Sequence, residues 1–118
     1  MRALSQVAGL LVGASLAYGP AQAAEPLKAE VIHWWTSGGE AAAVKVFADA
    51  YDQAGGQWID SAVAGGGGEA ARTAGINRIV GGNPPTMMQF TTGKQLAELV
   101  ANNYLVTLDA AAAAASSI

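Results

Sequence analysis

The chain has 118 residues with six Lys and Arg, nine Asp and Glu, one His and no Cys, for a formal net charge of −3. A mildly acidic chain lacks the basic patches that nucleic acids and anionic membrane surfaces require, so we expect neither as its main partner. The length suffices for one small domain, and without cysteine its stability must come from the core rather than from disulfides.

The first 23 residues have the features of an export signal. A short basic start is followed by a largely apolar stretch at 3–17, and residues 21–23 read Ala-Gln-Ala, a small-x-small cleavage site. Because the apolar stretch is short for a bilayer span, we predict a cleaved signal peptide at 1–23. An N-terminal membrane anchor is the alternative.

The first two elements after the signal are a strand and a helix. Residues 30–35 are β-branched or aromatic with few charges, which predicts a strand. Residues 39–54 carry apolar side chains at i, i+3, i+4 and i+7, the spacing of one helix face. That expected apolar stripe consists of Val44, Phe47, Ala48 and Tyr51.

A second strand and helix follow. Residues 57–64 are a strand candidate, and a helix is expected from residue 69 to about residue 80, with Arg72 and Arg78 facing solvent. The glycines, asparagine and prolines at 81–85 end this helix.

The third pair is shorter. We expect a strand at 86–90, a helix at 93–102 with Leu96, Leu99 and Val100 on one face, and a fourth extended piece at 104–108. The order βαβαβα predicts an α/β fold, with a parallel sheet, covering helices and right-handed crossovers.

The C-terminal tail differs in composition. Asp109 is followed by six alanines and then by Ser116, Ser117 and Ile118, without an apolar pattern. This tail is either a frayed helix or the point at which a reading frame was lost or a longer protein was cut. We favour the second interpretation, because a parallel sheet of three or four strands with no closing element looks unfinished.

Ligands of open parallel sheets bind beyond the carboxyl ends of the strands. This rule selects the segments 34–40, 65–69 and 89–93, and each of them opens into a predicted helix with free backbone N–H groups. We therefore expect a binding crevice at this edge of the sheet.

Two adjacent tryptophans end the first predicted strand. Trp34 and Trp35 point to opposite sides if the strand persists, so at most one faces the crevice squarely. An indole face stacks on the apolar face of a pyranose, and the nearby Glu40 carboxylate accepts hydrogen bonds from hydroxyl groups. This suits a neutral, hydroxyl-rich ligand such as a sugar. The alternative, two core aromatics and a favourable charge in a helix's first turn, stays open.

A run of four glycines precedes the second helix. Gly65-x-Gly67-x-x-Ala70 has the form of a dinucleotide fingerprint, but that fingerprint also needs an acidic residue about 20 positions on. None lies between Glu69 and Glu98, and no Lys-Ser/Thr follows the glycines as a P-loop requires. The run, with Gly66 and Gly67 at its centre, instead indicates close approach of the backbone to a ligand or to another segment.

Polar residues also follow the third predicted strand. Gln89 and Thr91 share one side of an extended chain while Phe90 packs away, so the amide and hydroxyl can bind sugar hydroxyls. Lys94 is a weaker candidate, since most lysines are solvated.

Support for catalysis is slight. His33 is the only histidine and lies inside a strand, where a satisfied, partly buried imidazole is more typical than a base. Metal-ligand spacing and a G-x-S-x-G elbow are absent from the sequence. We therefore expect no enzymatic activity, no cofactor and no metal.

Three stretches resemble one family in order and in spacing. They are residues 31–40 (Val-Ile-His-Trp-Trp-Thr-Ser-Gly-Gly-Glu), 63–68 (Val-Ala-Gly-Gly-Gly-Gly) and 81–90 (Gly-Gly-Asn-Pro-Pro-Thr-Met-Met-Gln-Phe). The chain is similar here to the periplasmic sugar-binding proteins of bacterial ABC importers, and more narrowly to the glucose- and aldose-type members of the family 1 extracellular solute-binding proteins.

This resemblance implies a partial first lobe of a type II periplasmic-binding-protein fold, from a two-lobed clamshell that closes on a sugar. Because the family chain is several times longer, we predict an N-terminal fragment. Its parts are a signal peptide at 1–23, an incomplete N-terminal lobe at 24–109 and a low-complexity Ala/Ser tail at 110–118.

The resemblance also implies site residues. In similar proteins the tandem tryptophans and the following glutamate contribute to the sugar site, which selects Trp34, Trp35 and Glu40. Gln89 matches a glutamine after the third strand. Thr91 stands where some relatives carry a charged or imidazole side chain, and this departure leaves the sugar's identity open.

The implied function is the sugar-binding component of a binding-protein-dependent ABC transport system, located in the periplasm. Its implied partners are a monosaccharide such as glucose or a related aldose and an ABC permease in the inner membrane, and we expect a monomer. Half a site cannot close over its ligand, so binding should be weak or lost. The alternatives are an exported α/β nucleotide-binding or enzymatic module and a nonfunctional remnant.

Overall fold

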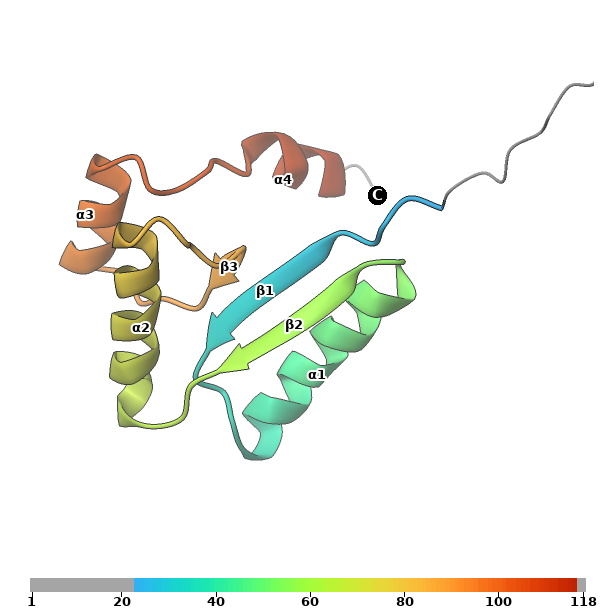
Figure 1. The fold of residues 1–118 in the computed structure, drawn as a ribbon, viewed down its shortest axis with the longest axis horizontal. Coiled ribbons are helices and arrows are strands. Elements are labelled where there is room, and N and C mark those ends of the chain that lie inside the picture. Colours follow the sequence, from blue (N-terminus) through green and yellow to red (C-terminus); the bar gives the residue numbers. More distant parts are fainter. Residues whose placement is uncertain (1–22, 117–118) are drawn as a thin grey trace, which may run out of the picture.

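The computed structural model describes residues 23–116, which form helices and strands in alternation (Figure 1). The predicted signal peptide at 1–23 lies outside this range except for Ala23. The elements are β1 (Lys28–His33), α1 (Gly38–Gln53), β2 (Gln57–Ala62), the 3₁₀ turn η1 (Gly66–Gly68), α2 (Glu69–Val80), β3 (Met87–Met88), α3 (Lys94–Ala101) and α4 (Asp109–Ala115).

The strands form one three-stranded parallel sheet in the order β2-β1-β3. β1 pairs with β2 along its whole length, from Lys28 opposite Gln57 to His33 opposite Ala62. The predicted α/β class and the parallel sheet are therefore confirmed, with β1 as the central strand.

β3 is shorter than predicted, with two residues in place of 86–90. The backbone N–H of Gln89 still donates to the Ile32 carbonyl at 2.8 Å, but the Gln89 side-chain oxygen then accepts the Trp34 N–H at 3.2 Å. A side chain thus takes the place of the next main-chain partner, and the strand ladder ends there.

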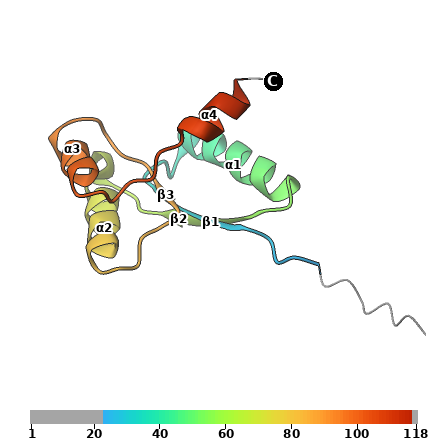
Figure 2. The same cartoon turned by 90° about the horizontal axis from the view of Figure 1, so that it is seen from above.

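The two long helices cover opposite faces of the sheet, as the view along it shows (Figure 2). On the α2 face, Gly75 leaves room for the Met88 side chain, whose strand neighbour is Ile32. α1 lies over the other face, where Val44 is buried. None of the helices within residues 23–116 combines the length and apolarity needed to cross a bilayer.

The core is small, because the sheet is narrow. Its buried apolar residues are Ala29, Ile32, Val44, Ala71 and Leu99. The expected stripe on α1 is only partly buried, since Phe47 remains 61% exposed. On α3, Val100 is likewise exposed beside the buried Leu99. The apolar periodicity gave the correct helices, but the described chain provides no second layer for their outer edges.

The segment 104–108 was expected to be extended and forms no strand. Its apolar side chains, including Val106, are exposed, so nothing in the described chain pairs with it. The alanine run after it forms α4, as the high helix propensity of alanine favours. No residue of α4 is buried.

Arg72 and Arg78, which were expected to be able to face solvent, are only partly exposed, and both guanidinium groups contact other parts of the fold. The Arg78 guanidinium donates to both Glu30 carboxylate oxygens, at 2.5 and 2.7 Å, and Ser61 donates to the same carboxylate at 2.8 Å. These bonds tie α2 to β1 and β2, and the hydrogen bonds from Arg78 and then from Ser61 lower the pKa of Glu30 to about 2. Arg72 contacts an aromatic ring instead, with its guanidinium carbon 5.7 Å from the Trp34 ring centre.

The glycine run is explained by the same tryptophan. A side chain at Gly68 would overlap the Trp34 ring, and Gly68 has a left-handed φ of +88°. The close approach predicted for this run is therefore confirmed at Gly68, and the neighbour is a segment of the chain itself.

The Glu30–Arg78 pair predicts an acid-sensitive fold. Because the Glu30 pKa in the folded state is about 2, against an ordinary value of 4.5, its contribution to stability is complete above about pH 4.5. It is lost as the pH falls toward 2. Urea unfolding at a series of pH values should show this decline, and Glu30→Gln should flatten it. Arg78→Lys keeps the charge but loses the two-pronged geometry, so its decline should be intermediate. Identical pH profiles for all three proteins would contradict this assignment.

The two neighbouring glycines give a matched pair of stability variants. Gly67→Ala introduces a side chain at a φ of +55° into open space, so it should cost about 1 kcal/mol of unfolding free energy. Gly68→Ala adds overlap with the Trp34 ring and should cost about 1–3 kcal/mol more. Equal urea midpoints for the two variants would show that overlap with the Trp34 ring adds nothing to the loss of stability.

Candidate functional site

The carboxyl ends of the three parallel strands meet at one edge of the sheet. β1 and β2 end beside the starts of α1 and α2 (Figure 1). The three segments predicted from sequence come together here, because the Trp34 ring contacts Gly68 and its backbone N–H binds Gln89. The two tryptophans and their neighbours therefore lie at the edge of the sheet where a ligand of this fold is expected to bind.

The two tryptophans lie on opposite faces of the sheet, as expected. Trp34 is half-buried on the α2 side, between Gly68 and the Arg72 guanidinium. Arg72 also donates to the Gly67 carbonyl at 3.2 Å, which holds it over the ring. These contacts favour the packing interpretation for Trp34.

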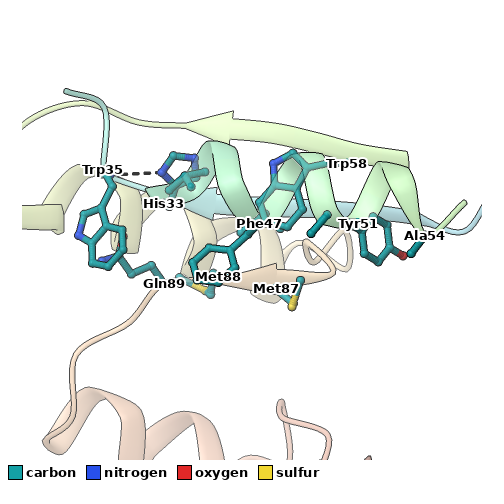
Figure 3. A pocket seen from close by; sticks show the side chains of 12 residues that line it. His33, Trp35, Phe47, Tyr51, Ala54, Trp58, Met87, Met88 and Gln89 are labelled. Carbon is teal, nitrogen blue, oxygen red and sulfur yellow. Dashed lines mark hydrogen bonds between the residues drawn. The ribbon is translucent and has the colours of Figure 1, made fainter. Parts of the chain in front are cut away.

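Trp35 lies on the α1 side, where its indole lines a groove together with His33 and Gln89 (Figure 3). The ring is half-buried, so part of its surface remains accessible. Of the two tryptophans, Trp35 is therefore the better candidate for stacking on a ligand.

Gln89 connects the two tryptophans. Its side-chain oxygen accepts the Trp34 backbone N–H at 3.2 Å, which fixes the orientation of the carboxamide. The carboxamide nitrogen has no hydrogen-bond partner within residues 23–116 and lies in the groove that Trp35 lines. It can therefore donate to a ligand hydroxyl group.

His33 is the buried polar residue of this edge and is only 4% exposed. Its Nε2 lies 2.5 Å from Asp60 Oδ1 on β2, and its Nδ1 accepts the Trp35 backbone N–H at 3.2 Å. The prediction of a hydrogen-bonded imidazole is confirmed, and the ring is more completely buried than the partial burial expected.

The remaining predicted site residues are exposed. Glu40 lies in the first turn of α1, Gly66 and Gly67 lie in η1, and Thr91 follows β3. No hydrogen bond within residues 23–116 joins Glu40 or Thr91 to either tryptophan. The alternation predicted for Gln89 and Thr91 does not extend to Thr91, because the strand ends at Met88.

The groove beside Trp35 runs along the sheet under α1 and has a volume of about 650 Å³ (Figure 3). Most of it is apolar, since Val31, Phe47 and Met87 are among its lining residues. A sugar needs several converging hydrogen-bonding groups. Away from Trp35 and Gln89, the groove offers few polar groups, among them the Tyr51 hydroxyl, which donates to the Leu27 carbonyl, and the buried Trp58 indole N–H. The groove as a whole is therefore not a sugar pocket.

A smaller hollow of about 370 Å³ lies on the β2 side of Trp35 and is more polar. Thr36, Lys45 and Asp60 line it. Sequence reasoning missed Asp60 and Arg72 as neighbours of the tryptophans, because neither occurs in the strand-end segments. The one available signal for Asp60 was its charged side chain within a predicted strand.

Within residues 23–116, no three His, Cys, Asp or Glu side chains gather closely enough to hold a metal ion. The chemistry available at this edge is aromatic stacking and hydrogen bonding, by Trp35 and Gln89 in particular.

No protein-family model matches the chain, but curated relatives do. A probable sugar-binding periplasmic protein of Mesorhizobium japonicum is 46% identical over 83 residues, which cover 68% of this chain and 20% of the relative. Proteins with the same name from Rhizobium meliloti and Brucella suis are 47% identical over 83 residues and 48% identical over 69 residues.

These two alignments cover 70% and 58% of this chain, and 19% and 16% of the relatives. The chain thus spans about a fifth or less of the length of the curated relatives it matches. Over the matched region, the resemblance to periplasmic sugar-binding proteins predicted from the three sequence stretches is confirmed.

Proposed function

We propose that this chain supplies part of a sugar site and acts as a component of a periplasmic sugar-binding protein for an ABC importer. The observation that carries this proposal is the position of the Trp35 indole beside the Gln89 carboxamide, beyond the carboxyl ends of β1 and β3 (Figure 3). The names of the relatives, which are probable sugar-binding periplasmic proteins, give independent support.

In the proposed complex, the accessible face of Trp35 stacks on the C–H face of a pyranose. The Gln89 carboxamide nitrogen donates to a sugar hydroxyl while its oxygen keeps the Trp34 N–H. Glu40 accepts hydrogen bonds from hydroxyls, and the exposed backbone of Gly66 and Gly67 borders the same edge. Thr91 and Trp34 are outer members of this site.

The proposed role is binding and delivery rather than catalysis. The ligand is a monosaccharide such as glucose or a related aldose, and the receiving partner is an ABC permease in the inner membrane. The chain acts in the periplasm as a monomer. The names of the relatives support a sugar ligand and a periplasmic location, and the aromatic and polar character of the strand-end site supports a sugar ligand.

The described residues leave this site open. Glu40, Gly66, Gly67 and Thr91 are all exposed, so a bound sugar stays largely hydrated on one side. Enclosure of the ligand accounts for much of the affinity of small-molecule sites. We therefore expect dissociation constants of roughly 1 mM or weaker for this chain.

The direct test is a titration of the purified chain with glucose, galactose and xylose, followed by tryptophan emission. The Trp58→Phe variant removes the third tryptophan from the emission signal, and its buried indole N–H has no hydrogen-bond partner within residues 23–116. Trp34 and Trp35 then give the signal. A saturable millimolar response to one of these sugars is expected. Saturable micromolar binding would show that the open site suffices, and stabilisation by nucleotides alone in a thermal-shift screen would refute the sugar assignment.

Gln89 allows the ligand contact to be separated from the packing contact. Gln89→Glu keeps an oxygen for the Trp34 N–H but removes the amide donor, so sugar affinity should fall about tenfold while the melting temperature changes little. Gln89→Leu removes both groups and should lower both quantities. Unchanged sugar affinity in Gln89→Glu would exclude this residue from the site.

A further inference from the structure

We infer that His33 is a positioning residue for Trp35, and that Asp60 of the neighbouring strand orients the His33 ring for this task. The inference rests on the proposed function only in its consequence for sugar binding. The hydrogen-bonded arrangement itself can be tested without any ligand.

The imidazole is held between two partners. It is 4% exposed, in contrast to Asp60, whose side chain is 55% exposed. The ring joins the end of β1 to β2 through the 2.5 Å contact between Nε2 and Asp60 Oδ1. Through Nδ1 it accepts the backbone N–H of Trp35, two residues further along.

These contacts assign the tautomer. Because the Trp35 N–H is a donor, His33 Nδ1 must carry a lone pair. The single proton of the neutral ring is then on Nε2, where it donates to the Asp60 carboxylate. With the other tautomer, two N–H groups would face each other at Trp35 and the Nε2 lone pair would face a carboxylate.

Side-chain acceptors are needed here because the main-chain pairing of β1 ends just before the two tryptophans. β1 ends at His33, whose carbonyl accepts the Val63 N–H at 2.8 Å, and the N–H groups of Trp34 and Trp35 have no main-chain partner within residues 23–116. Gln89 binds the first of them and His33 the second. The backbone of the two tryptophans is thus held by Gln89 toward β3 and by His33, whose ring binds Asp60, toward β2. The direction of the Trp35 indole depends on the second of these, the bond from the Trp35 N–H to His33.

The tautomer can be measured on the unaltered chain. In ¹⁵N NMR spectra of the imidazole at neutral pH, the proton is expected on Nε2, with Nδ1 in the range of an unprotonated acceptor. A proton on Nδ1, or on both nitrogens, would overturn the inference. This measurement requires no variant and no sugar.

Two substitutions separate the two contacts of the ring. The amide oxygen of His33→Asn stands where Nδ1 was and can still accept the Trp35 N–H, but it does not reach Asp60. The amide nitrogen of His33→Gln stands where Nε2 was and reaches Asp60, but leaves the Trp35 N–H without an acceptor. Hydrogen exchange of the Trp35 amide should therefore be roughly threefold to tenfold faster in His33→Gln than in His33→Asn.

Asp60 has its own matched pair. Asp60→Ala removes the acceptor for Nε2–H and should accelerate exchange at the Trp35 amide, while Asp60→Asn keeps an oxygen acceptor and should change it less. Equal exchange rates in all four variants and in the unaltered chain would refute the positioning role. If the unaltered chain shows the expected tautomer but no response to any sugar, the proposed function fails while this inference stands.

Discussion

The structure depends on the way β1 ends. As the central strand, β1 forms main-chain hydrogen bonds with both β2 and β3. The backbone N–H groups of the residues that follow β1 therefore lose their main-chain partners on both edges of the strand. Buried N–H groups without partners are costly, and here Gln89 and His33 side chains accept those of Trp34 and Trp35. The same two bonds that end the strand also fix the aromatic pair at the edge where ligands of parallel sheets bind.

Because neighbouring residues of an extended chain face opposite sides, this arrangement divides the two tryptophans between two tasks. Trp34 packs against Gly68 and Arg72 and thereby fixes the start of α2. Trp35 faces the groove and is the more accessible to a ligand's stacking face. The two adjacent tryptophans therefore do not both offer a stacking surface to a ligand. Trp34 packs within the fold and holds the backbone in place, and Trp35 is left accessible on the other face.

Most of the fold could be predicted from the sequence, because local patterns decide it. The α2 bounds were predicted closely, since Gly68 precedes the helix and glycines follow it. The length of β3 could not be predicted, because the Gln89 side-chain oxygen accepts the Trp34 N–H in place of a main-chain carbonyl. The exposure of Phe47 also escaped prediction, since periodicity marks an apolar face and not what covers it. At the site, the strand-end rule selected the right edge. It could not select Asp60, which binds His33, or Arg72, which lies over the Trp34 ring, because both contacts arise from tertiary packing alone.

The groove beside Trp35 shows why volume alone does not identify a sugar site. It is the larger of the two hollows beside Trp35, yet its walls are mostly hydrocarbon, and burying sugar hydroxyls there would cost their hydrogen bonds to water. Only the end formed by Trp35 and Gln89 combines a flat aromatic face with a fixed amide donor. The affinity of this chain for a sugar is therefore limited by how few polar groups converge there. How accurately Trp35 and Gln89 are positioned matters more for this affinity than the volume of the groove behind them.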